Sequence, residues 1–188
     1  MRKIVLASVL ALAATAAQAQ SLEQQVHQQA NELAKAKQLL NHADVNVRSA
    51  ALSNMLQSKD TAMRELAYAV GFSSADDVAR AITLSHRFNE TQLLRVELGE
   101  GDDRNANRLR ESLGGVLNVQ VRGYDEHNGR FEVRQFSGSH NGVGEVAGIQ
   151  VTLSQNACSA KFELDDSSLL RGNVVCGGIS LPASIDLF

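Results

Sequence analysis

Hydrophobic and polar residues follow two different rhythms along this chain, and the change comes near Phe88. Before it, apolar residues recur at intervals of three, four and seven, which is typical of amphipathic helices. After it, apolar and polar residues alternate in short runs separated by Gly, Asn, Asp and Ser, which is typical of strands. The pattern predicts an α+β fold, with an N-terminal array of about four short antiparallel helices followed by an antiparallel β-sandwich or barrel of about seven strands.

A sixteen-residue repeat marks the helical part. Its acidic and basic positions are Asp44, Arg48, Asp60, Arg64, Asp76 and Arg80. One continuous helix does not explain the interval, because sixteen residues make about 4.4 turns and the apolar face would rotate off the core. Each copy therefore predicts one short helix with the Asp at or near its N-cap. The Arg lies one turn above and is expected to pair with that Asp or with a neighbouring helix.

Small residues follow each Arg by three positions, at Ala51, Ala67 and Thr83, and are expected to let the helices approach closely. The segment 44–88, which opens with DVNVRSAAL, resembles the HEAT-like helical repeats, in which an Asp-x-x-x-Arg step and small residues mark helix packing. The resemblance implies a concave surface that binds a partner. The period differs from that family, whose units are helix pairs of about 40 residues. The alternative interpretation is a plain helical bundle built by duplication.

The first twenty residues have the pattern of an export signal. Arg2 and Lys3 precede an uncharged, mostly apolar run over residues 4–16, and Ala17-Gln18-Ala19 is an A-x-A cleavage site. That run is shorter than the roughly 20 residues that a membrane-spanning helix needs. We therefore expect residues 1–19 to be a cleaved signal peptide, and the mature chain to be periplasmic with no transmembrane segment.

Two domains are expected in the mature chain, a helical repeat domain over 20–90 and an antiparallel β domain with one disulfide over 91–188. The first helix is expected to begin at Ser21, because Ser21–Gln24 has the sequence of a capping box. One face of this helix is marked by Leu22, Val26, Leu33 and Leu40.

The register of a predicted hairpin indicates whether the two cysteines of the chain can form a disulfide. Pairing Leu164 with Leu170 around a five-residue loop places Cys158 directly opposite Cys176. Directly opposed residues of an antiparallel pair have Cα atoms about 4.5–5.5 Å apart, which is within disulfide range. We predict a Cys158–Cys176 disulfide, because the rival interpretation as reactive thiols lacks a C-x-x-C spacing.

The net charge and the sequence motifs limit the classes of function that this chain can have. The net charge is −3 and falls to −5 when Arg2 and Lys3 leave with the signal peptide, so the basic surface that nucleic-acid binding requires is missing. No motif indicates a catalytic residue, a metal ligand or a cofactor, and none is expected. We therefore expect a non-catalytic binding or assembly module of the bacterial cell envelope, with an envelope protein or a small ligand as its partner.

Two alternatives stay open at this point. The first is a periplasmic hydrolase whose site is assembled from dispersed residues such as His140, Asp125 and Glu145. The second is a structural envelope component that self-associates through its helices. The sequence leaves the question of enzymatic activity undecided and favours the absence of catalysis.

Overall fold

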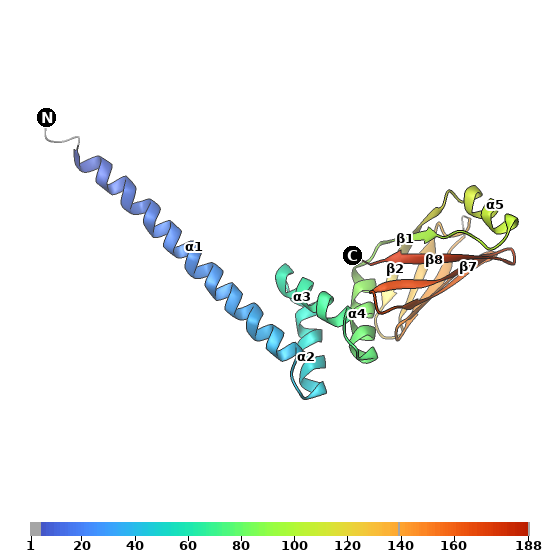
Figure 1. Cartoon of the computed structure of the whole chain (residues 1–188), viewed down its shortest axis with the longest axis horizontal. Coiled ribbons are helices and arrows are strands. Elements are labelled where there is room, and N and C mark those ends of the chain that lie inside the picture. The colour runs from blue at the N-terminus through green and yellow to red at the C-terminus, as the bar shows by residue number, and fades with distance from the viewer. Residues whose placement is uncertain (1–4, 139, 188) are drawn as a thin grey trace.

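The computed structural model describes residues 5–138 and 140–187, and places four helices ahead of a β-barrel (Figure 1). The helices of this part of the chain are α1 (Val5–Leu40), α2 (Val45–Leu56), α3 (Thr61–Phe72) and α4 (Asp77–Glu90). A further short helix, α5 (Arg104–Ser112), lies between the first two strands. Helices give way to strands between Glu90 and Leu93, at the position where the hydrophobic rhythm changes.

Eight strands form a closed antiparallel barrel, which decides between the two predicted architectures. They are β1 (Leu93–Leu98), β2 (Val116–Asp125), β3 (Arg130–Arg134), β4 (Gly142–Ala147), β5 (Gln150–Gln155), β6 (Cys158–Leu164), β7 (Leu169–Cys176) and β8 (Ile179–Asp186). Each strand pairs with the next one in the chain, and β8 pairs back with β1. Closure leaves the sheet without an edge strand, and so removes the unpaired backbone groups that promote aggregation.

The predicted number of strands was one too low. The sequence of residues 145–154 has the alternation of a single strand, but the chain turns within it and supplies both β4 and β5. Ala147 pairs with Gln150, so the turn has only two central residues, the first of which is Gly148 with a φ of 62°. A tight hairpin turn needs this left-handed conformation, which glycine adopts at little cost.

The repeated Asp residues are the N-caps of α2, α3 and α4. The carboxylates of Asp44, Asp60 and Asp76 accept backbone N–H groups from the first turn of their own helices. The repeated Arg residues differ from the prediction. Arg48 and Arg64 each donate to a carbonyl in the turn that precedes their own helix, six residues back in both cases. In these two copies the repeat therefore specifies a helix with an Asp N-cap, and the Arg of that helix donates a hydrogen bond to the turn that precedes it.

Close packing of α3 and α4 depends on Gly71 and on Thr83, which is one of the small residues of the repeat. Thr83 is fully buried, and it lies so near α3 that a Cβ added at Gly71 would be 2.0 Å from its Oγ1 atom. Helices approach this closely only where one of them has no side chain at the contact. Gly71 and Thr83 thus set the separation of the last two helices.

The first helix is longer than expected. With residues 1–19 present, α1 is continuous from Val5 to Leu40, whereas the helix start at Ser21 is a prediction for the mature chain. Residues 1–4 of the predicted signal peptide lie outside the described residues. Among the residues that are described, no helix is both long and apolar enough to cross a membrane.

Helix α4 joins the helical array to the barrel by covering one of its mouths (Figure 1). Phe88 is fully buried there, with its ring centroid 5.4 Å from that of Phe131 and 6.3 Å from that of Tyr124. Ser85 forms a hydrogen bond with the Tyr124 hydroxyl, and Arg87 donates to the carbonyl of Leu187. The buried residues of helices and strands consequently form one contiguous core.

Candidate functional site

The interior of the barrel is filled by side chains. Large inward residues face glycines on the next strand: Phe131 pairs with Gly144, and Phe162 pairs with Gly172. A Cβ added at Gly144 would lie 2.2 Å from the Phe131 ring, so the ring occupies the space that a side chain would take. Eight-stranded barrels are narrow enough to be packed in this way. A ligand of this barrel would therefore bind on its outer surface.

Both mouths of the barrel are covered as well. Helix α4 lies over one mouth, and α5 lies against β8 at the other. Ala106 of α5 is buried, and the Arg110 side chain donates to the Leu98 carbonyl at 2.9 Å, which fixes α5 to the end of β1. The outer faces of the strands and the helices are what remains for recognition.

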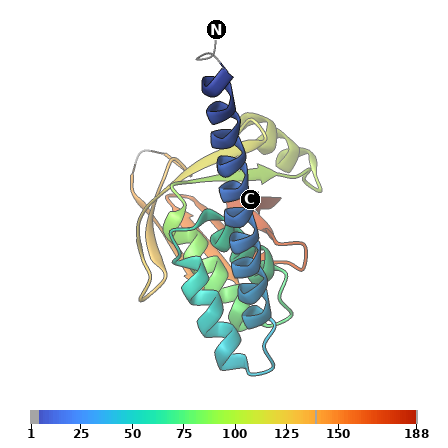
Figure 2. The same cartoon turned by 90° about the vertical axis from the view of Figure 1, so that its left-hand side faces the viewer.

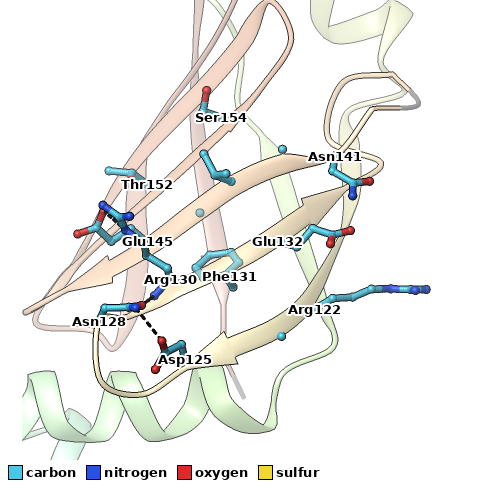
Figure 3. A pocket seen from close by; sticks show the side chains of 14 residues that line it. Arg122, Asp125, Asn128, Arg130, Phe131, Glu132, Asn141, Glu145, Thr152 and Ser154 are labelled. Carbon is cyan, nitrogen blue, oxygen red and sulfur yellow. Dashed lines mark hydrogen bonds and ion pairs between the residues drawn. The ribbon is translucent and has the colours of Figure 1, made fainter.

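A groove of about 850 Å³ runs across the outer faces of β2 to β5 (Figure 3). Most of its lining residues have polar side chains, although more of the lined surface is apolar than polar, and they come from all four strands and their turns. The side chains that project into it include Arg122, Asp125, Asn128, Arg130, Glu132, Asn141, Val143, Glu145, Thr152 and Ser154. A second hollow of about 590 Å³ adjoins it and shares Arg122 and Gly123 with it.

The floor of the groove is formed largely by backbone. Gly142 and Gly144 point inward from β4, and between them Val143 projects outward with 68% of its surface exposed. On β2 the pairing with β3 shifts register between Arg122 and Asp125, and Gly123 within the shift has a φ of 60°. Such an irregularity bends a strand and increases its twist. The groove follows from these features.

Charges in the groove are arranged in cross-strand rows. Along one row Asp125 lies opposite Arg130, Arg130 opposite Glu145, and Glu145 opposite Thr152. The Arg130 Nε atom is 3.9 Å from Glu145 Oε2. In the neighbouring row Arg122 lies opposite Glu132, which is ion-paired with Arg134. Opposite charges facing each other stabilise an antiparallel sheet, and they leave the groove with mixed charge.

The three residues considered for a hydrolase are not brought together. Asp125 and Glu145 both line the groove, but His140 is not among its lining residues and is exposed. The Asp125 carboxylate accepts the backbone N–H of His127 at 2.9 Å and the side-chain amide of Asn128 at 2.6 Å, which shapes the β2–β3 turn. The arrangement provides no base positioned beside a nucleophile.

The loop that carries His140 is held by Gln155, a buried residue that the sequence did not single out. Its side-chain oxygen accepts the backbone N–H of Ser137, and its amide nitrogen donates to the His140 carbonyl. Asn156 also donates to the Ser137 carbonyl. These bonds hold the backbone of Ser137 and of His140 at the end of β5.

A second polar cluster, which the sequence also missed, lies between α3 and α4. The buried hydroxyl of Tyr68 is 2.9 Å from Glu90 Oε2 and 2.8 Å from His86 Nδ1. The Glu90 carboxylate can only accept, so the phenol donates its proton to Glu90 and receives a hydrogen bond from the ring N–H of His86. Burial raises the pKa of the Tyr68 phenol, and Glu90 raises it further. Tyr68 therefore stays neutral and joins the two helices.

The predicted disulfide is confirmed. Cys158 and Cys176 are bonded, with Cα atoms 4.2 Å apart, and the register around them pairs Leu164 with Leu170 as expected. The bond lies at the end of the barrel remote from the helical array. Cys158 pairs with Gln155, next to the groove residue Ser154, so the bond links β6 to β7 beside one end of the groove.

Arg80 departs from the other two arginines of the repeat. It is buried at the contact between α4 and the β6–β7 turn, where it donates to the Leu164 carbonyl and lies 3.1 Å from Asp77. Its Nε atom is buried and has no hydrogen-bond partner among the described residues. The third copy of the repeat thus fixes the array to the barrel.

Within residues 5–138 and 140–187, no group of three or more His, Cys, Asp or Glu side chains could hold a metal ion. Comparisons with protein families, curated proteins and solved structures found no match. Function must therefore be argued from the geometry of this chain alone.

Proposed function

We propose that this protein is an exported, non-catalytic binding or assembly module of the bacterial cell envelope. The observation that carries the proposal is the contrast between a packed, covered barrel and an open groove on its outer wall. Side chains fill the interior, α4 and α5 cover the ends, and the hollow over β2–β5 presents polar groups from four strands. This geometry favours recognition at the surface over chemistry in an enclosed site.

Export is supported by the pattern of residues 1–19 and by the disulfide, since disulfides form and persist in oxidising compartments such as the periplasm. The HEAT-like resemblance of residues 44–88 adds a second surface on which an envelope partner could bind. The mixed charge of the groove favours a polar small ligand or a polar protein surface over a strongly charged polymer.

The test is affinity capture from an envelope extract, with a groove variant and a matched control. Val143→Lys places a long charged side chain in the groove at an exposed position, so the fold should be retained. Ser180→Lys introduces the same lysine at an exposed position of β8, outside the groove and the hollows that adjoin it. We expect a ligand or protein that the wild type and Ser180→Lys retain and Val143→Lys does not. Equal retention by Val143→Lys would contradict the assignment of the groove.

The hydrolase alternative is favoured by one observation, the shared position of Asp125 and Glu145 in the groove. It predicts that extract components are cleaved on incubation with the protein and that Asp125→Asn abolishes the cleavage. Mass spectrometry of the incubated extract separates this outcome from binding, because a bound ligand is recovered intact.

A further inference from the structure

Helix α1 projects beyond the rest of the helical array as a single rod (Figures 1 and 2). Every residue from 22 to 32 is exposed, although this span carries large apolar side chains. Leu22 is 63% exposed and Val26 is 56% exposed. Isolated helices of this length are marginally stable in water, because most helical stability in proteins comes from packing of an apolar face. The projecting span therefore lacks the contact that would stabilise it.

The apolar positions of the span continue a seam that is already packed. Leu22, Val26 and Leu33 form what we call the α1 stripe, and steps of three and four residues extend it to Ala36 and Leu40. Ala36 and Leu40 are buried, where α1 packs against α2 and α3. Apolar residues at these alternating steps are the a and d positions of a coiled coil. The stripe is thus the uncovered half of a helix-packing surface.

We propose that a second copy of this chain covers the α1 stripe, with its own α1 antiparallel to the first. A parallel pair is disfavoured by the fold, because α2 and α3 occupy the same seam at Ala36 and Leu40 and would meet their counterparts. In the antiparallel pair the two arrays lie at opposite ends. Leu22 of one copy then lies opposite Leu33 of the other, and Val26 lies opposite Gln29.

Flanking charges are compatible with this register. Residues 23 and 30 flank the seam on one side (e positions), and residues 25 and 32 flank it on the other (g positions). In the antiparallel pair Glu23 therefore lies beside Ala30 of the other copy, and Gln25 lies beside Glu32. No like charges face each other, and the Gln25 amide can donate to the Glu32 carboxylate. The span from residue 22 to 33 is only about 18 Å long at 1.5 Å per residue. An interface of this length is smaller than those of permanent dimers, so the dimer is weak and its population rises with protein concentration.

Analytical ultracentrifugation of the exported protein tests the association. We expect a monomer at micromolar concentration and a growing dimer fraction toward millimolar concentration. Leu22→Gln combined with Val26→Gln should remove the dimer. Gln24→Ala combined with Asn31→Ala, on the opposite face of α1, should leave it unchanged. A wild type that remains monomeric throughout, or a dimer that survives loss of the stripe, would overturn the proposal.

Cross-linking tests the orientation. Both native cysteines are bonded to each other, so a thiol introduced on α1 is the only free one among the described residues. Leu22→Cys mixed with Leu33→Cys should yield a disulfide-linked heterodimer on mild oxidation, whereas Leu22→Cys alone should not cross-link. Cross-linking of position 22 to itself would refute the antiparallel register. Neither experiment involves the groove, so their results and those of the capture experiment are independent.

Discussion

The contact between Arg80 and the barrel can be measured against an internal control, because the repeat supplies equivalent arginines. Arg80→Met keeps an unbranched side chain of similar length and removes the hydrogen bond to the Leu164 carbonyl. Arg64→Met removes a hydrogen bond from the same repeat position to the Ser58 carbonyl, which is partly exposed. The two variants therefore differ in burial and in what they connect, while the chemical change is the same.

Hydrogen bonds of a charged donor contribute about 1.5–3 kcal/mol, but Arg80 also buries an Nε atom that has no partner among the described residues, which costs free energy. We therefore expect Arg80→Met to lower the free energy of unfolding by about 2 kcal/mol. For Arg64→Met the expected loss is below about 1 kcal/mol, because water can replace the guanidinium at a partly exposed carbonyl.

Urea unfolding followed by circular dichroism measures both losses, with the slope against urea as a check that the unfolding reaction is unchanged. Equal losses in the two variants would mean that Arg80 does not connect the array to the barrel. A gain in stability on Arg80→Met would mean that the cost of burying the guanidinium exceeds the strength of its hydrogen bonds.

Three further changes test other parts of the fold. Gly71→Ala should destabilise by about 1–2 kcal/mol, since overpacking against Thr83 exceeds the gain in helix propensity; urea unfolding that shows a more stable variant would refute the close approach of α3 and α4. Replacing Cys158 and Cys176 by Ala should cost about 3 kcal/mol through loop entropy and leave the barrel intact by circular dichroism; an unchanged stability would contradict this. Burial would raise the pKa of Asp165, but hydrogen bonds from its own turn and from a neighbouring arginine outweigh it and lower the pKa to about 2. The stability that Asp165 contributes is present above the unfolded pKa of about 4 and lost as pH falls to 2, so the difference in unfolding free energy between wild type and Asp165→Asn should vanish over that range; a constant difference would be inconsistent.

Local signals in the sequence were sufficient for several features. The N-caps at Asp44, Asp60 and Asp76 depend on residues one turn away, and the disulfide follows from the register of a single hairpin. The separation into helices and strands near residue 88 is likewise a matter of short-range periodicity. Features of this kind are predictable because the interacting groups are close in the chain.

Long-range contacts could not be predicted in the same way. Arg80 and Leu164 are 84 residues apart, and nothing in the repeat distinguishes Arg80 from Arg48 or Arg64. The Tyr68 cluster joins residues 18 and 22 positions apart on two helices, and only their relative rotation brings them together. The groove also escaped prediction, because it depends on how closure of the barrel curves four strands around inward-facing glycines.

The wrong strand count has a specific origin. Alternation through 145–154 continues across Gly148 without interruption, so the pattern alone fits one long strand. In the barrel Val146 and Val151 both face inward from adjacent strands, and the turn between them inverts the direction of the chain. A glycine inside an alternating run can therefore mark either a bulge within one strand or a turn between two strands. In this closed barrel Gly148 lies in a turn.

Helix α4 explains why the two halves of this chain are better treated as one body than as separate modules. Its first turn is capped like the other repeat helices, its buried Thr83 packs on α3, and its Phe88 covers the barrel mouth. The Phe88 ring contacts Tyr124 and Phe131, so the array and the groove strands β2 and β3 share one packed aromatic contact. If a second copy holds α1, the grooves of the two barrels lie at opposite ends of the dimer, and a partner that engages both must span that separation.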